Sequence, residues 1–182
     1  MINRAVYLRF LVIPERLIKI IPMNDTHPQT PAIRYLEERG VPHQVFQHAG
    51  QIFSLEQAAA ERNQQPEQVV RSIVFRVADG EYLMVLMAGP GQVPWKALRR
   101  HLGQSRLTMA TEEELLQVTG YRPGTVTPFG LPRPMLVLID QGVIDQPEIS
   151  LGSGQRGLAI LMKPADLRAA LDQVEIVRFS TE

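Results

Sequence analysis

The stretch RSIVFRVADGEYLMVLMA, Arg71–Ala88, decides what kind of fold this chain can adopt. It holds two runs rich in β-branched and apolar residues, and Asp79-Gly80 lies between them. A dipeptide of this kind favours the left-handed backbone of a tight turn, so the stretch predicts an antiparallel hairpin.

Helices are predicted on both sides of the hairpin, because the sequence carries their start and stop signals. Most begin at a capping residue or a proline and end at a glycine. The expected helices are PAIRYLEERG (31–40), SLEQAAAERN (54–63), PWKALRRHLG (94–103), TEEELLQVTG (111–120) and PADLRAALDQ (164–173). The further expected strands are VPHQVFQH (41–48), MLVLID (135–140), RGLAILM (156–162) and VEIVRF (174–179). A mixed α/β fold of the α+β kind is therefore predicted.

The composition limits the classes of function. The 182 residues suffice for one domain, and 19 basic against 19 acidic residues leave no overall positive field that would attract DNA or RNA. Because there is no cysteine, disulfides, thiolate zinc sites and cysteine nucleophiles are excluded, which fits a cytoplasmic protein. The four histidines show no metal-ligand spacing, so no metal site is expected.

The first 29 residues are predicted to be an extension outside the fold, and residues 30–182 to form one domain. The opening is apolar, but Arg4, Arg9, Arg16 and Lys19 interrupt it before a signal peptide or membrane span can develop. Residues 1–22 are interpreted as a dispensable extension or a misassigned start, with a transit peptide or a partner-binding helix as alternatives.

The stretch LGSGQRG, Leu151–Gly157, has the glycine spacing of a dinucleotide-binding fingerprint. That fingerprint needs a helix directly behind it, because the helix N-terminus holds the pyrophosphate. Here a strand-like run follows, and the next helix starts only at Pro164. No nucleotide cofactor is expected, and the glycines are predicted to form a tight loop between strands.

The densest irregular segment is TGYRPGTVTPFGLPRP, Thr119–Pro134. Proline fixes φ and lowers the entropy lost on ordering, so this loop is stiff for its length. A stiff loop with exposed amides can hold a polar group such as a developing oxyanion. It can equally be a connector between a helix and a strand, and its composition alone leaves both readings open.

Five segments in a fixed order resemble the YbaK/ProX family of aminoacyl-tRNA editing domains. They are TPAIRYLEERGVPHQVFQH (30–48), EQVVRSIVF (67–75), VPWKALRRHLG (93–103), YRPGTVTPFG (121–130) and SGQRGLAILMKPADL (153–167). The resemblance covers residues 30 to 178. It implies a curved, largely antiparallel mixed sheet surrounded by helices, and hydrolysis of the ester that joins a mischarged amino acid to tRNA, without a cofactor. A second hydrolytic site of this kind is needed because binding energy discriminates poorly between similar small side chains.

The resemblance also implies the site residues. The Gly-x-x-x-Pro loop of the family matches Gly124 to Pro128, with Thr125 and Val126 between them as substrate-binding residues. A lysine of the family aligns with Arg71, and Ser72 follows it. Arginine keeps the charge for binding substrate, but it cannot exchange a proton near neutral pH.

Further candidates surround this set. Asp140 corresponds to a recurrent aspartate of the family, which would orient Arg71 or bind the substrate amine, or it is a turn residue at a strand end. Ser153 and Gly154 are predicted to line the amino-acid pocket. A basic cluster on one predicted helix, with Trp95 beside it, would contact tRNA or form a solvated face and a core contact. The cluster is Lys96, Arg99 and Arg100.

Two functional hypotheses follow. The first is a free-standing deacylase for mischarged tRNA of the Cys- or Ala-tRNA(Pro) type. The second, which the arginine at position 71 motivates, is a weakened module that binds aminoacyl-tRNA ends or a synthetase partner without turnover. A nucleotide-dependent oxidoreductase would rest on the glycine spacing alone. Membrane and DNA partners are not expected.

Overall fold

The computed structural model describes residues 20–21 and 28–179 of the chain. Within that part the helices are α1 (Pro31–Glu38), α2 (Leu55–Glu61), α3 (Trp95–Leu102), α4 (Glu112–Thr119), α5 (Gln141–Ile144), α6 (Pro164–Ala169) and the 3₁₀ turn η1 (Pro66–Gln68). The strands are β1 (Ile20–Ile21), β2 (Gln44–Gln47), β3 (Val70–Ala78), β4 (Glu81–Ala88), β5 (Thr108–Met109), β6 (Leu136–Asp140), β7 (Ile149–Gly152), β8 (Leu158–Met162) and β9 (Val174–Val177).

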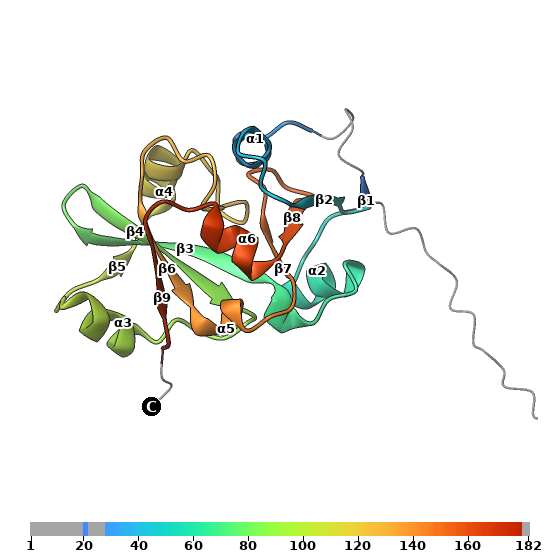
Figure 1. The fold of residues 1–182 in the computed structure, drawn as a ribbon. Helices are drawn as coiled ribbons and strands as arrows, with labels where there is room; N and C mark the ends of the chain where they lie inside the picture. Colours follow the sequence, from blue (N-terminus) through green and yellow to red (C-terminus); the bar gives the residue numbers. More distant parts are fainter. Residues whose placement is uncertain (1–19, 22–27, 180–182) are drawn as a thin grey trace, which may run out of the picture.

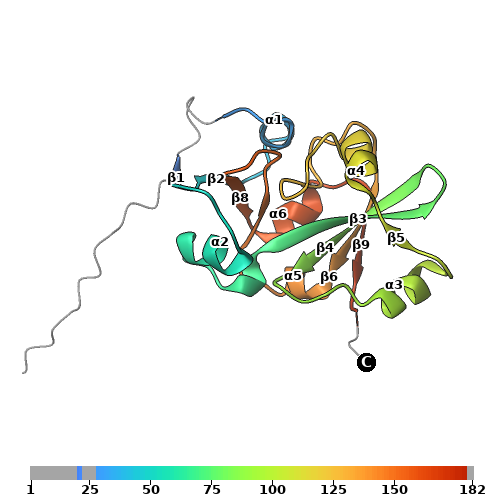
Figure 2. The same cartoon turned by 180° about the vertical axis from the view of Figure 1, so that it is seen from behind.

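The strands of the described residues form two sheets, which Figures 1 and 2 show in opposite halves of the molecule. The first has the order β1-β2-β8-β7 and is antiparallel throughout. The second has the order β5-β3-β4-β6-β9, in which β6 runs parallel to both of its neighbours. A single parallel bridge, Val69 with Ser150, joins them. The predicted mixed, largely antiparallel α/β class is confirmed, but the sheet is divided in two.

The predicted hairpin is present as β3 and β4. Its turn is Asp79-Gly80, and Gly80 has φ of 70°, a conformation that glycine adopts without strain. Along β4, side chains alternate between the two faces of the sheet. Leu83 and Val85 pack in the cluster beside α3, whereas Met84 and Leu86 enter the larger core between the two sheets. The continuous apolar run is explained because both faces of β4 are buried.

The helix signals in the sequence also act as predicted. Thr30 and Ser54 accept hydrogen bonds from the third residue of α1 and α2, at 3.2 and 3.1 Å. Thr111 and Glu114 form a reciprocal capping box at the start of α4. Gly103 ends α3 in the left-handed conformation.

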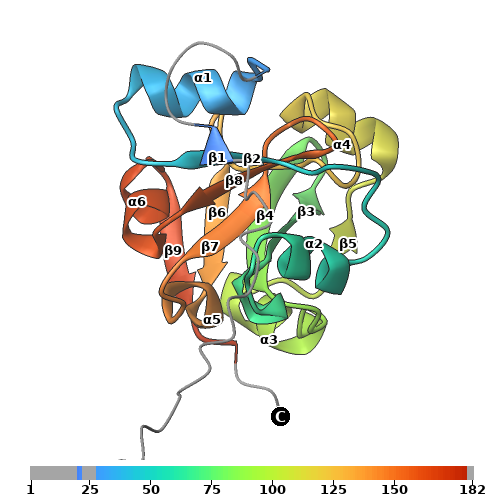
Figure 3. The ribbon, with the colours of Figure 1, turned by 90° about the vertical axis from the view of Figure 1, so that its right-hand side faces the viewer.

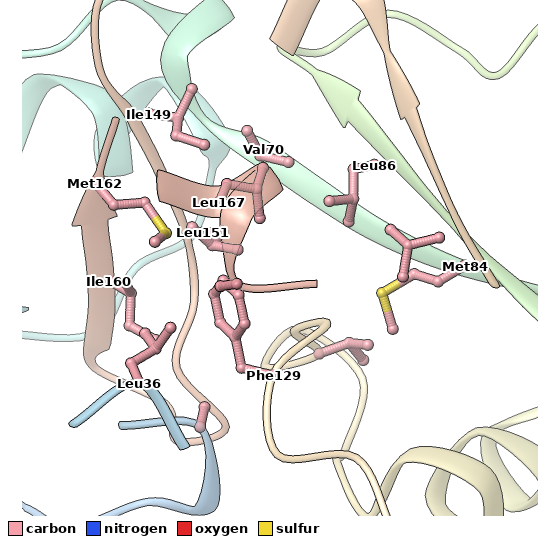
Figure 4. Packing of buried hydrophobic residues seen from close by; sticks show 14 of the residues in the cluster. Leu36, Val70, Met84, Leu86, Phe129, Ile149, Leu151, Ile160, Met162 and Leu167 are labelled. Carbon is pink, nitrogen blue, oxygen red and sulfur yellow. The ribbon is translucent and has the colours of Figure 1, made fainter. Parts of the chain in front are cut away.

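The main core lies between the two sheets, where Figure 4 shows side chains from both converging on Phe129. Leu36 of α1, Ile160 of β8 and Leu86 of β4 are fully buried there. Figure 3 views the four-stranded side, with α1 above β2 and α2 below it. Residues distant in sequence therefore share one core, and this core fixes how the loops between the sheets meet.

Several short elements escape sequence prediction, namely η1, β5, α5 and β7. The strand β7 has only four residues and ends at a glycine, so its alternation is too short to detect. It pairs with β8, and the glycines Gly154 and Gly157 form the loop between them, as predicted. Strand β8 follows this loop directly, as the strand-like run in the sequence predicted.

Most of the predicted extension, residues 1–29, lies outside the described residues. Residues 20–21 form β1 and pair with β2, with Ile20 opposite Phe46. The domain boundary at residue 30 stays a prediction. In the described part of the chain, no helix has both the length and the apolar character that crossing a bilayer requires.

The loop that precedes β6 and the loop between β7 and β8 are packed backbone against backbone. The Gly154 amide donates to the Thr125 carbonyl at 3.0 Å, and Thr30 Oγ1 donates to the Ser153 carbonyl at 2.6 Å. A Cβ added at Gly152 would lie 2.5 Å from the Val126 carbonyl oxygen. Only glycine permits this approach.

Gly152→Ala should therefore destabilise the protein. We expect a loss of about 1–3 kcal/mol in the free energy of unfolding, because the new methyl group must push two backbones apart. Urea unfolding of the two proteins measures it. Gly50→Ala is the matched control, since a Cβ there meets nothing within 4 Å. Equal stability of both variants would contradict the packing argument.

Tyr121 gives the fold a dependence on alkaline pH. Its hydroxyl donates to the Phe129 carbonyl at 2.7 Å, and burial raises the pKa of the phenol to about 12. In the unfolded chain the same phenol has a pKa near 10.0. The contribution of Tyr121 to the free energy of unfolding is therefore complete below that pH and is lost as the pH rises toward about 12.

Replacing this residue by phenylalanine, Tyr121→Phe, should make the free energy of unfolding fall less steeply with rising pH. Between the two pKa values the wild type should lose about 1.4 kcal/mol more per pH unit than the variant. Urea unfolding across this range compares the two, and the other titrating groups cancel because both proteins share them. Parallel pH curves would show that the phenol does not titrate as argued.

Candidate functional site

A cavity of about 730 Å³ opens between α2, the start of β3 and the two packed loops. Four parts of the chain line it: the segment from His48 to Arg62, residues 69–72, the loop at Gly124 and Val126, and the end of β7 with the loop after it. The first two parts are neighbours in sequence, whereas the other two lie far from them along the chain and meet them because the two sheets share one core.

The cavity brings together the two features on which the sequence interpretation depends. Arg71 and Ser72 reach it from β3, and Gly124 and Val126 reach it from the proline-rich loop. A Cβ added at Gly124 would meet nothing within 4 Å, while its φ of 80° strains any other residue. The backbone at Gly124 is therefore open to a molecule in the cavity.

Five of the predicted catalytic and substrate-binding residues do not line this cavity. Thr125, Pro128 and Ser153 are buried behind it, Gly154 packs against the Tyr121 ring, and Asp140 lies at the end of β6. The Ser153 hydroxyl bonds the Gln155 and Leu158 carbonyls at 3.2 and 3.1 Å. These contacts fix the conformation of the loop between β7 and β8, the glycine loop. Ser153 therefore supports the cavity wall from behind.

Asp140 caps a helix in this structure. Its carboxylate accepts a hydrogen bond from the Gly142 amide at 3.0 Å, at the start of α5. This geometry matches the interpretation of Asp140 as a turn residue at a strand end. The Arg71 guanidinium binds other partners, and within the described residues no hydrogen bond or ion pair joins it to Asp140.

Arg71 is held by main-chain oxygens. Its Nε donates to the Gly89 carbonyl at 2.7 Å, and its Nη2 donates to the Gly91 carbonyl. Partial burial lowers the pKa of the guanidinium, which stays charged at neutral pH. Arg71 thus ties the end of β4 to the cavity wall, in addition to placing positive charge there.

Three polar groups of the lining lack a partner within the described residues. The Ser72 hydroxyl is buried and has no hydrogen bond. The amides of Gly124 and Val126 also have no acceptor in the described part of the chain. Buried polar groups normally have partners, so a bound molecule is a reasonable partner for the Ser72 hydroxyl. Gly124 is exposed, so its amide is open to water or to a ligand.

The basic cluster of α3 lies elsewhere. Lys96, Arg99 and Arg100 do not line the cavity, and Figures 1 and 2 show α3 and α2 at opposite sides of the molecule. Trp95 packs edge-on against Phe75, with ring centroids 5.1 Å apart. Trp95 is partly buried and packs against the core cluster that holds Phe75, the kind of contact that one of its two interpretations predicted. Contact of the cluster with tRNA stays a prediction.

The sequence interpretation missed the cavity wall made by residues 48–62. His48 Nδ1 lies 2.7 Å from Glu61 Oε2, and this hydrogen bond holds the pKa of the Glu61 carboxyl below its usual range. Arg62 is buried, and Phe53 is 80% exposed. These residues lie in a loop and at the end of a short helix, where polar and aromatic side chains are also common on solvated surfaces. No sequence signal therefore distinguishes them from ordinary surface residues.

No cluster of three or more potential metal ligands occurs among the described residues. His27, one of the four histidines, lies outside them.

Comparison with solved structures agrees with the fold. A protein described as a candidate trans-editing enzyme for prolyl tRNA synthetase superposes with a TM-score of 0.73 and 25% identity, over 84% of this chain and 100% of that one. The hypothetical protein APE2540 gives a TM-score of 0.73 at 18% identity, over 81% and 97% of the two chains, which supports the fold alone.

Comparison with curated proteins finds proline–tRNA ligase of Streptococcus pneumoniae (strain Hungary19A-6), 32% identical over 106 residues. The match covers 58% of this chain and 17% of the ligase, so the chain corresponds to a small part of that enzyme. Residues 49–170, which hold the cavity lining apart from His48, match the aminoacyl-tRNA editing domain. The chain belongs to the aminoacyl-tRNA editing domain family.

Proposed function

We propose that this protein is a free-standing deacylase that hydrolyses the ester of mischarged tRNA, of the Cys- or Ala-tRNA(Pro) type, in the cytoplasm. The observation that carries the proposal is the convergence of Arg71, Ser72 and the Gly124–Val126 backbone on one open cavity. The similarity to part of a proline–tRNA ligase, and to a candidate trans-editing enzyme, supports the choice of tRNA.

In this proposal the cavity stabilises the transition state of ester hydrolysis. Water attacks the ester carbonyl carbon, and the amides of Gly124 and Val126 are available to stabilise the oxyanion that forms. The bond to the ribose oxygen then breaks, releasing the free amino acid. The ribose oxygen takes the proton that the water gives up.

Ser72 and Arg71 have binding roles in this scheme. In this proposal the Ser72 hydroxyl, which lacks a partner in the described residues, hydrogen-bonds the aminoacyl group. Arg71 holds the 89–91 turn through its two carbonyl contacts and adds positive charge to the wall. Because arginine keeps its proton, Arg71 does not act as a proton shuttle.

Mischarged tRNA provides the direct test of the proposal. Purified protein should release amino acid from cysteinyl- or alanyl-tRNA(Pro) faster than buffer does. Arg71→Ala should reduce the rate by about tenfold or more, since charge and carbonyl contacts are lost together. Arg71→Lys should lie between, because one ammonium cannot reproduce the two-point grip.

Other results of the deacylation assay would favour a different function. No release across cysteinyl-, alanyl- and seryl-tRNA(Pro) would reject the deacylase. The commitment of Arg71 to two backbone carbonyls favours one second candidate, a module that binds aminoacyl-tRNA ends without turnover. That candidate predicts affinity for a non-hydrolysable analogue, and hydrolysis that is absent in the wild type and gained with Arg71→Lys.

Ser72→Ala separates substrate binding from stability. We expect deacylation to fall about tenfold, because a hydrogen bond to substrate is lost. Stability should be unchanged or slightly raised, since the alanine removes a buried hydroxyl that has no partner in the described residues. Rates and thermal melting of the purified variant measure the two effects.

Ser150→Ala is the matched control. Its hydroxyl is also buried without a partner in the described part of the chain, but Ser150 does not line the cavity. Its activity should equal that of the wild type. An equal fall in both serine variants would remove Ser72 from the site.

A further inference from the structure

Arg62 is a buried cation at the wall of the cavity. It follows the last residue of α2 and is only 8% exposed. Within the described residues its side chain makes one hydrogen bond, from Nε to the Ala58 carbonyl at 2.7 Å. The rest of the guanidinium has no protein acceptor there.

The neighbouring carboxylate does not fill this role. Glu61 accepts hydrogen bonds from His48 and Gln57, at 2.7 and 3.0 Å, and no ion pair joins it to Arg62 in the described residues. It adds a favourable field at Arg62, but burial outweighs this field and lowers the pKa of the guanidinium to about 10. Arg62 therefore remains charged at neutral pH although it is buried without an ionic partner.

The cavity itself has one sign of charge. Its lining contains Arg62, Arg71 and Arg156, and none of the lining side chains among the described residues is aspartate or glutamate. Arg71 is engaged with the Gly89 and Gly91 carbonyls, and Arg156 is exposed to water. Arg62 is therefore the cation for which a bound anion would relieve the largest desolvation cost.

We propose that Arg62 is a phosphate-binding residue of this cavity, and that it takes the phosphate on the 5′ oxygen of the terminal nucleotide. The assignment rests on the proposed function, which brings an aminoacylated RNA end into the cavity. A guanidinium donates two parallel hydrogen bonds to phosphate oxygens, which makes it suited to this ligand.

The test uses two non-hydrolysable probes, 3′-alanylamino-3′-deoxyadenosine with and without a 5′-phosphate. Wild-type protein should bind the phosphorylated probe about tenfold more tightly, the gain of one charge-assisted contact. Arg62→Gln should abolish this preference while it still binds the unphosphorylated probe. Arg168→Gln, an exposed arginine of α6 outside the lining, should keep it.

Two more variants separate binding from structure. Arg62→Met removes the unpaired charge but keeps the length of the side chain, so it should lose the preference while its melting temperature stays equal or rises. Arg62→Lys should keep part of the preference. With a short single-stranded acceptor RNA, Arg62→Gln should reduce the slope of log affinity against log salt by about 0.7.

The outcomes are distinguishable. A preserved preference in Arg62→Gln and Arg62→Met, with a lowered melting temperature, would make Arg62 a helix cap only and overturn the inference, while deacylation would stand. Inorganic phosphate that binds as tightly as the phosphorylated probe would point to a free-phosphate site and also overturn it. If neither probe binds, the proposed function itself fails and the inference fails with it.

Discussion

Two backbones meet without a side chain between them where Gly152 lies against the carbonyls of Thr125 and Val126. This contact sets the distance between the proline-rich loop and the glycine loop, and so the shape of the cavity. It is possible because Gly152 has no Cβ, and it is reinforced by the hydrogen bond from Gly154 to Thr125. The core between the sheets supports both loops from behind, with Phe129 fully buried at its centre.

The cavity assigns different tasks to its cations. Two nitrogens of Arg71 already donate hydrogen bonds to main-chain carbonyls after β4, so fewer of its donors remain for a ligand. Arg62 is buried and has no ionic partner among the described residues, so its charge is available to a ligand. A buried charge of this kind costs stability, and such costs are found where a protein binds something. The burial of Arg62 without an ionic partner in the described residues therefore supports an anionic ligand more strongly than the mere presence of an arginine would.

Prediction from sequence succeeded where the signal was local. The hairpin turn at Asp79-Gly80 and the caps at Thr30, Ser54 and Thr111 depend on a few adjacent residues, and all are present. The family resemblance named Arg71 and Gly124, and the structure brings both to one cavity, although their role there stays a prediction. It did not separate wall from support, because Ser153 and Asp140 read as polar loop residues whether they face a ligand or hold a turn.

The sequence by itself determined the longer helices and strands, because hydrophobic periodicity and turn chemistry act over a few residues. It also determined the family, through five segments in order. Only the tertiary structure decided that the sheet divides in two, that α3 lies away from the cavity, and that Arg62 and His48 belong to its wall. Burial and hydrogen-bond partners arise from contacts between residues distant in the chain, and a local pattern carries no record of them.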